Sequence, residues 1–290
     1  MWATLLRAVA YLAILYLAIA LFLWVSQSRL IFFAPKGAVP DPGAFGFTGS
    51  RVAVETADGV TLHGWYLSPE GPTGSAREAP APALIWFYGN AENLAFLAPL
   101  IGTLRPPGHA MLVLDYRGYG QNGGRPNEDG LYRDADAAWE YLAGRPEIDP
   151  HRIAVFGRSL GSVPALYLAD TRPVAAVILD SPFTTARAMA RVHYRLFPSF
   201  LVRYDMDNLA RARRLAAPLL IIHGTVDRIA PFTMGRALAE AGRAQAFYEV
   251  RGAGHNDVYE TAGPGYRDTI HEFLEAVRDV PDSHPPTENR

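Results

Sequence analysis

Apolar residues along this chain follow three patterns, and the first of them is an unbroken apolar segment near the N-terminus. It runs from Ala8 to Val25, with Arg7 before it and Arg29 and Lys36 after it. Its length approaches that of a helix that crosses a bilayer, so we expect residues 1–28 to form an N-terminal membrane anchor. The competing hypothesis is a cleaved signal peptide, whose apolar region is normally shorter and ends in a small-x-small site. Similar positive charge on both flanks leaves the orientation open, and we favour the rest of the chain on the outer, extracytoplasmic side.

The second pattern is alternation of apolar and polar residues, which is typical of half-buried strands. It occupies residues 51–55 and 61–67, and the turn residues Ala57, Asp58 and Gly59 separate the two segments. This arrangement predicts a β-hairpin. Residues 32–49, rich in Pro, Gly and Phe, are interpreted as a spacer that packs against the domain. Residues 69–82, rich in Pro, Gly and Ala, predict an exposed loop.

The third pattern consists of short, continuous apolar segments separated by stretches with helical periodicity. The predicted buried strands are residues 83–87, 111–114, 153–156, 175–179, 219–222 and 247–250. The intervening helices include residues 131–142 and a last helix over 266–280, in which Ile270, Phe273, Leu274 and Val277 share one face. Such strands predict a mostly parallel sheet with helices on both faces. We expect one α/β domain over residues 29–280, a cap insertion over about 183–215, and a disordered polar tail over 281–290.

Chemistry is indicated first by the segment Gly157-Arg158-Ser159-Leu160-Gly161, which lies between a predicted strand and a predicted helix. A serine between glycines on a strand-to-helix turn is typical of the nucleophile elbow of an α/β-hydrolase, where flanking residues must be small because strand and helix approach closely. The motif alone is weak, and its context strengthens it. Pro164 falls early in the following helix, where proline is tolerated.

A serine hydroxyl is a weak nucleophile unless a neighbouring base removes its proton. In this fold the partners follow the serine in the order acid, then histidine. Asp227 follows the strand at 219–222, and His255 lies in a glycine-rich loop after the strand at 247–250. We therefore predict a catalytic triad of Ser159, Asp227 and His255. Asp180 is a rival acid, although capping its own turn is the simpler role for it.

Acyl transfer also needs donors directed at the developing oxyanion. We expect these donors to be the backbone N–H groups of Leu160, which directly follows the nucleophile, and of Asn90. Asn90 lies in the loop Tyr88-Gly89-Asn90-Ala91-Glu92-Asn93, where Gly89 permits a sharp turn. A plain strand-to-helix turn capped by asparagine is the alternative.

Composition and charge narrow the remaining possibilities. The formal net charge of −2 gives no electrostatic reason to expect a nucleic-acid partner, and the absence of cysteine excludes disulfides, thiolate nucleophiles and cysteine-ligated metals. No His, Asp and Glu cluster has metal-ligand spacing, so we expect no metal and no cofactor. His63 and His223 are interpreted as structural. Several arginines are interpreted as a solvated face, or as contacts to anionic lipid headgroups: Arg187, Arg191, Arg195, Arg203, Arg211, Arg213 and Arg214.

Five motifs together resemble the Bem46-like α/β-hydrolases, a family of serine hydrolases that includes the abhydrolase-13 and abhydrolase-17 groups. They are the Asn90 loop, Asp115-Tyr116-Arg117-Gly118-Tyr119-Gly120, the Ser159 elbow, His223-Gly224-Thr225-Val226-Asp227, and Gly254-His255-Asn256-Asp257. The resemblance covers about residues 32–280. It implies a Ser/Asp/His esterase on Ser159, Asp227 and His255, oxyanion donors at Asn90 and Leu160, and often a single membrane anchor. One departure is Tyr88, which stands where the family usually has a loop-bracing histidine.

We therefore expect a membrane-anchored serine hydrolase of carboxylic esters or thioesters, acting on small-molecule or lipid-like acyl esters through an acyl-enzyme. The alternatives are a peptidase or amidase with the same triad, and a catalytically silent binding protein that keeps the fold. The physiological substrate and the oligomeric state are left open by the sequence.

Overall fold

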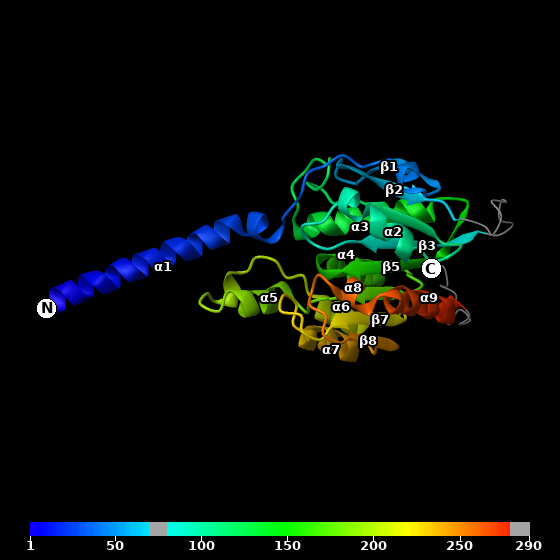
Figure 1. Cartoon of the computed structure of the whole chain (residues 1–290). Helices are drawn as coiled ribbons and strands as arrows, with labels where there is room; N and C mark the ends of the chain where they lie inside the picture. Colours follow the sequence, from blue (N-terminus) through cyan, green and yellow to red (C-terminus); the bar gives the residue numbers. More distant parts are fainter. Residues whose placement is uncertain (70–79, 279–290) are drawn as a thin grey trace, which may run out of the picture.

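The computed structural model describes residues 1–69 and 80–278, which form a long N-terminal helix and an α/β domain (Figure 1). Helix α1, Trp2–Ile31, is 30 residues long, and none of its residues is buried. It is long and apolar enough to cross a membrane. Figure 1 shows α1 projecting away from the body of the domain. The spacer after it packs against the domain as expected, because Phe32 and Val39 are buried.

The centre of the domain is an eight-stranded sheet with the strand order β1-β2-β4-β3-β5-β6-β7-β8. The strands are β1 Gly49–Glu55, β2 Thr61–Leu67, β3 Ala81–Phe87, β4 Ala110–Leu114, β5 Ile148–Arg158, β6 Val177–Asp180, β7 Leu219–Gly224 and β8 Ala246–Val250. Strand β2 pairs antiparallel with both β1 and β4, and every other pairing is parallel. The predicted hairpin and the predicted parallel sheet are both confirmed.

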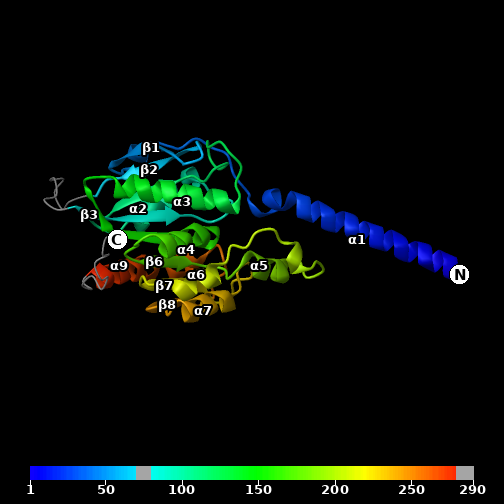
Figure 2. The ribbon, with the colours of Figure 1, turned by 180° about the vertical axis from the view of Figure 1, so that it is seen from behind.

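Helices cover both faces of this sheet. Their bounds are α2 Leu94–Leu104, α3 Glu128–Ala143, α4 Ser162–Thr171, α5 Ala186–His193, α6 Asn208–Arg214, α7 Phe232–Ala241, α8 Val258–Ala262 and α9 Pro264–Arg278, with short 3-10 helices η1 Pro42–Phe45, η2 Ser159–Gly161 and η3 Ser199–Leu201. Helices α3, α4, α6 and α7 contact one another in series on one face, whereas α2, α8 and α9 lie on the other (Figures 1 and 2).

Local sequence explains where several of these helices begin. The side chain of Asn93 accepts a hydrogen bond from the N–H of Phe96 at the start of α2, and Asn127 does the same for Gly130 at the start of α3. Such caps satisfy backbone donors that have no partner inside a helix. The segment between β6 and β7 forms α5, η3 and α6, and α5 lies on the same side of the domain as α1 (Figure 2).

The prediction for the segment before β3 is wrong. Residues 69–82 were expected to be an exposed loop, but β3 already begins at Ala81, which is buried. The strand register shifts between Ala81 and Ala83, so Pro82 lies at an irregularity where a proline is tolerated in a sheet. Residues 70–79 of the expected loop, the end of the expected helix at 279–280 and the expected tail at 281–290 lie outside the described residues.

Candidate active site

The turn between β5 and α4 places Ser159 at the carboxyl edge of the sheet. The backbone φ of Ser159 is 48°, in the left-handed region that residues other than glycine rarely adopt. Such a conformation costs on the order of 1–3 kcal/mol, and it is typical of functional turns. A Cβ at Gly157 would lie 2.5 Å from the carbonyl oxygen of Gly161, and one at Gly161 would lie 2.0 Å from that of Phe87. Both glycines are therefore required for strand and helix to approach.

Three side chains that lie far apart in the sequence meet at this turn. The distance from His255 Nε2 to Ser159 Oγ is 2.8 Å, and the distance from His255 Nδ1 to Asp227 Oδ2 is 2.7 Å. Because an ionised carboxylate only accepts, Nδ1 carries the proton and Nε2 is left to accept from the serine hydroxyl. The structure thus brings together the three residues of the predicted triad, in hydrogen-bonding geometry.

The carboxylate of Asp227 is fixed by its own loop. Its Oδ1 accepts hydrogen bonds from the backbone N–H groups of Ile229 and Ala230, at 2.8 and 2.9 Å. Burial acts to raise the pKa of Asp227, but hydrogen bonds from His223 and His255 outweigh it and hold the pKa well below its ordinary value. Asp227 therefore stays ionised, as an acid that orients an imidazole must.

His223 contacts Asp227, which the sequence did not indicate. Its imidazole is fully buried, and Nε2 lies 2.8 Å from the carbonyl oxygen of Ala230 and 3.3 Å from Asp227 Oδ2. Both neighbours only accept, so Nε2 carries the proton. A Cβ at Gly235 would lie 2.2 Å from the other ring nitrogen. His223 is structural, as expected, and what it supports is the carboxylate of Asp227.

Asp180, the rival acid, contacts other groups. Its Oδ1 accepts from the hydroxyl of Ser181, and its Oδ2 accepts from the hydroxyl of Tyr266, both at 2.8 Å. Oδ2 also lies 3.6 Å from Nε of Arg158. The interpretation that Asp180 serves its own turn agrees with these contacts, and the carboxylate on His255 is that of Asp227.

The Asn90 loop lies beside the serine, but the side chain of Asn90 has a role that the sequence did not predict. Asn90 and Leu160 line the same pocket as Ser159. The Nδ2 of Asn90 donates to the carbonyl of Ile31, and its Oδ1 accepts from the backbone N–H of Phe33, so it holds the end of α1. Within the described residues, the backbone N–H of Asn90 has no hydrogen bond to a protein acceptor.

Sequence comparisons show which known proteins this chain is similar to. The uncharacterized protein Rv2307c of Mycobacterium tuberculosis is 41% identical over 273 residues, which cover 93% of this chain and 94% of that protein. Alpha/beta hydrolase domain-containing protein 17B of Xenopus laevis is 39% identical over 182 residues, 60% of each chain. A family profile described as "Serine aminopeptidase, S33" matches residues 78–211. The chain belongs to the abhydrolase-17-like α/β-hydrolases.

Solved structures support the same fold for this abhydrolase-17-like chain. The esterase Pf2001 of Pyrococcus furiosus superposes with a TM-score of 0.66 at 20% identity, covering 84% of this chain and 97% of the esterase. At that identity the similarity concerns the fold alone. Membership of the family supports hydrolase activity for this chain. The type of bond that the chain cleaves has to be argued from the site.

Tyr88 replaces the histidine that the family usually has, and it still braces the loop. Its hydroxyl donates to Asp115 Oδ1 at 3.0 Å and accepts from the backbone N–H of Tyr116 at 3.1 Å. Asp115 Oδ1 also accepts from the N–H of Leu94 at the start of α2. Burial raises the pKa of Asp115 to about 6, although these hydrogen bonds act to lower it. Tyr88 therefore links the residues that directly follow β4 to the loop that contains Asn90.

Arg158, inside the elbow motif, is the residue whose importance the sequence analysis missed. Its side chain is 14% exposed and forms an ion pair with Glu92 of the Asn90 loop. Its Nη2 donates to the carbonyl oxygen of His255 at 3.1 Å. The other Glu92 oxygen accepts from the N–H of Gly89 at 2.7 Å. A single guanidinium thus joins the loop expected to bind the oxyanion to the loop that carries the histidine.

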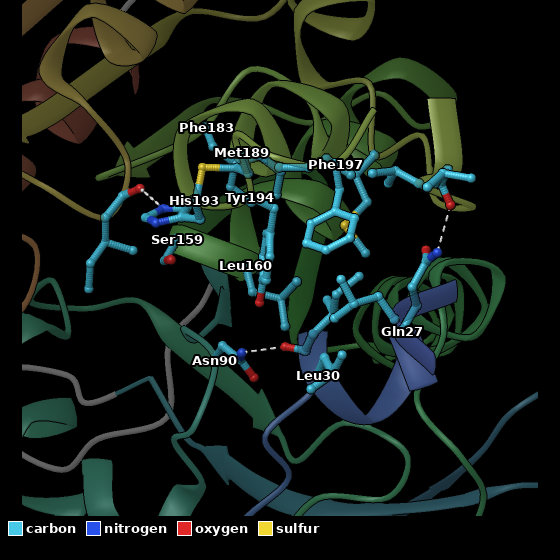
Figure 3. Close-up of a pocket in the computed structure, with 18 of the residues that line it drawn as sticks. Gln27, Leu30, Asn90, Ser159, Leu160, Phe183, Met189, His193, Tyr194 and Phe197 are labelled. Atoms are coloured by element: carbon cyan, nitrogen blue, oxygen red, sulfur yellow. Dashed lines mark hydrogen bonds between the residues drawn. The ribbon is translucent and has the colours of Figure 1, made fainter. Parts of the chain in front are cut away.

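The pocket above Ser159 has a volume of about 430 Å³, within the range of small-molecule sites. Most of its lining is apolar, and the segment between β6 and β7, where the cap is expected, contributes Phe183, Met189, Phe197 and Leu201. Figure 3 shows Gln27 and Leu30 of α1 facing these cap residues across the pocket. Helix α1 therefore contributes to the wall of the pocket. The apolar sequence of α1 gave no indication of this contact.

The cap arginines are only partly a solvated face. Arg187 lies 3.2 Å from Asp205, Arg214 pairs with Asp170, and Arg211 lies over the ring of Tyr132.

Across residues 1–69 and 80–278, no group of three or more His, Asp and Glu side chains is arranged to hold a metal ion.

Proposed function

We propose that this chain is a serine hydrolase of carboxylic esters or thioesters, anchored to a membrane by α1. The observation that carries the proposal is the continuous hydrogen-bond series from Ser159 through His255 to Asp227, at 2.8 and 2.7 Å. It lies at the base of an apolar pocket and at the carboxyl edge of a parallel sheet, where open α/β sheets hold their ligands.

In the proposed reaction, Ser159 Oγ attacks the acyl carbonyl while His255 Nε2 takes the hydroxyl proton. The tetrahedral intermediate collapses when the imidazolium returns this proton to the leaving alkoxide or thiolate, which departs as alcohol or thiol. Water, deprotonated by the same imidazole, then attacks the acyl-enzyme and releases the carboxylic acid and free serine. Asp227 stays ionised throughout and stabilises the imidazolium.

Backbone donors complete the proposed site. The N–H groups of Asn90 and Leu160 would bind the oxyanion, since both residues line the pocket beside Ser159. Removal of one such donor typically costs about 10²–10³ in kcat. Because the Asn90 donor belongs to the backbone, its position depends on Arg158 and Tyr88, which hold the Asn90 loop.

Hydrolysis of p-nitrophenyl acetate by the purified full chain tests this proposal. We expect turnover by the wild type and by Ser199→Ala, a control serine in η3 outside the pocket lining. We expect Ser159→Ala to lose it by a factor of about 10⁴ or more. Equal turnover in all three proteins would contradict the assignment, and no turnover in any would favour a silent binding protein.

A peptidase is the second candidate, because the matching family profile carries the description of a serine aminopeptidase. The same triad can cleave amides, so the bond has to be identified by measurement. A matched panel of p-nitrophenyl esters and aminoacyl-p-nitroanilides separates the two. A kcat/KM that is higher for anilides than for esters of equal acyl length would replace the esterase by a peptidase.

A further inference from the structure

The pocket of the proposed active site lies between the cap and the helix assigned to the membrane. From α1, the side chains of Leu23, Trp24, Gln27 and Leu30 contribute to its lining. Large apolar side chains elsewhere on α1, such as Leu12, Leu15 and Phe22, are exposed, as expected of a helix that contacts lipid. A ligand in the pocket would therefore contact the same helix that contacts the bilayer.

The segment after α5 contacts α1 at its C-terminal end and also near its middle. Gln27 Nε2 donates to the carbonyl oxygen of Leu201 at 2.7 Å, a contact that Figure 3 shows with Gln27 labelled. Nearer the middle of the helix, the hydroxyl of Tyr16 donates to the carbonyl oxygen of Leu196 at 3.0 Å. The rings of Tyr16 and Phe197 also stack, with centroids 5.3 Å apart. The segment 194–201, here called the cap tip, thus lies along the middle of α1.

The position of Tyr16 sets a depth for the cap tip. The apolar segment of α1 ends at Val25, next to Trp24, whose ring lies 4.9 Å from the guanidinium of Arg203. A tryptophan beside an arginine is typical of the boundary between headgroups and hydrocarbon. Tyr16 lies nine residues before Val25, or about 14 Å along the helix axis at 1.5 Å per residue. Half of the hydrocarbon core is about 15 Å, so a cap tip at the level of Tyr16 lies inside one leaflet.

The surface of the cap tip suits this location. Leu196 is 82% exposed and Phe200 is 77% exposed, which is unfavourable in water. Arg195 lies beside them, and its long side chain can extend its charge back to the headgroups. Other exposed apolar side chains lie on loops or helix starts at the carboxyl edge of the sheet or at the end of α1: Phe33, Phe96, Val226 and Ile229.

We propose that the cap tip enters the leaflet that α1 crosses, and that the pocket receives the acyl chain of a bilayer-resident ester directly from the hydrocarbon. The inference rests on the proposed hydrolase function and on α1 as an anchor. The substrate class is thereby narrowed to esters or thioesters whose chain is dissolved in the membrane. Water-soluble short esters would reach the same serine without using the cap tip.

Because the natural chain has no cysteine, one introduced cysteine gives a unique label. We would attach an environment-sensitive fluorophore in Leu196→Cys, Phe200→Cys and His151→Cys, with the full chain in phosphatidylcholine vesicles. His151 is the control, because it is exposed near the amino end of β5, far from the active-site edge. We expect nitroxide groups on mid-chain lipid carbons to quench the labels at 196 and 200 but not at 151. Labels that remain in water at 196 and 200 would overturn the inference.

An activity measurement tests the consequence for substrates. Neither Leu196 nor Phe200 lines the pocket, so the double variant Leu196→Gln/Phe200→Gln should hydrolyse p-nitrophenyl acetate as the wild type does. We expect its hydrolysis of a long-chain ester embedded in phosphatidylcholine vesicles to fall by about tenfold or more, because both side chains lose their transfer into hydrocarbon. The apolar control Leu196→Met/Phe200→Leu should retain both activities.

The outcomes separate the two proposals. Equal hydrolysis of the vesicle substrate by the wild type and the glutamine variant would refute entry of substrate past an inserted cap tip. A wild type without activity on either ester, whose labels at 196 and 200 are nevertheless quenched by lipid, would refute the hydrolase and leave the membrane contact intact.

Discussion

Replacing Arg158 with methionine removes the cation that joins the Asn90 loop to the His255 loop. Burial acts to lower the pKa of Arg158, but Glu92 and Asp180 outweigh it and raise the pKa, so the guanidinium stays charged. The variant leaves Glu92 and Asp180 without this partner in a site where the arginine is 14% and Asp180 is 2% exposed. Loss of one member of a buried ion pair costs roughly 3–5 kcal/mol, and we expect about 3 kcal/mol because Glu92 retains some contact with water.

Two measurements follow from this magnitude. A destabilisation of about 3 kcal/mol lowers the Tm of a domain this large by roughly 6–12 °C, which calorimetry or circular dichroism detects. Small displacements of the histidine and of the oxyanion donors cost on the order of 10²-fold in kcat. Because Arg158 holds loops that carry the reacting groups, we expect kcat on p-nitrophenyl acetate to fall with little change in KM.

Two further variants make the test specific. Arg158→Lys keeps the charge but cannot form the forked contacts to Glu92 and His255, so it should recover part of the stability and less of the activity. Arg213→Met, at an exposed position of α6, should change stability by less than about 0.5 kcal/mol. If Arg158→Met retains both its Tm and its kcat, the guanidinium does not position the two loops and the reasoning is refuted.

Two other predictions concern the carboxylates near the site. Asp227→Asn should lower kcat by about 10⁴ with a nearly unchanged Tm, because an amide favours the wrong imidazole tautomer. A loss of kcat below tenfold would show that Asp227 is not the orienting acid. Tyr88→Phe removes a donor that stabilises ionised Asp115, whose pKa is raised to about 6. A raised carboxyl pKa favours folding below about pH 4, and this contribution is lost as pH rises through 6. Denaturation should therefore show a loss of about 1–2 kcal/mol for this variant at pH 8 and a smaller loss at pH 5, and an equal loss at both would contradict the ionised hydrogen bond.

The sheet and the proximity of the three predicted triad residues could both be predicted, because they depend on local patterns. Continuous apolar segments mark the strands, and the residues that directly follow them must lie at one edge of a parallel sheet. Ser159, Asp227 and His255 all occupy such positions, and the structure brings them within hydrogen-bonding distance. The close approach of strand and helix that the flanking glycines imply is also found, because a Cβ at Gly157 or Gly161 would collide with backbone oxygens.

Contacts between distant segments could not be predicted in this way. Arg158 meets Glu92 and His255 across separations of 66 and 97 residues, and nothing in its immediate sequence indicates either partner. The segment of α1 from Ala8 to Val25 is apolar on every side, so no periodicity distinguishes a pocket wall from a lipid-facing surface there. Polar residues occur near the end of this helix, and two of them, Gln27 and Ser28, form hydrogen bonds with residues 201–204.

Covalent labelling by a fluorophosphonate tests the central claim most directly, because it reports whether the hydroxyl of Ser159 is activated. Intact mass and peptide mapping of the full chain should show one adduct, located on Ser159, in the wild type. Denatured protein and His255→Ala should label far more slowly, since neither offers the serine a base. An adduct on another serine, or equal labelling of native and denatured protein, would contradict the account.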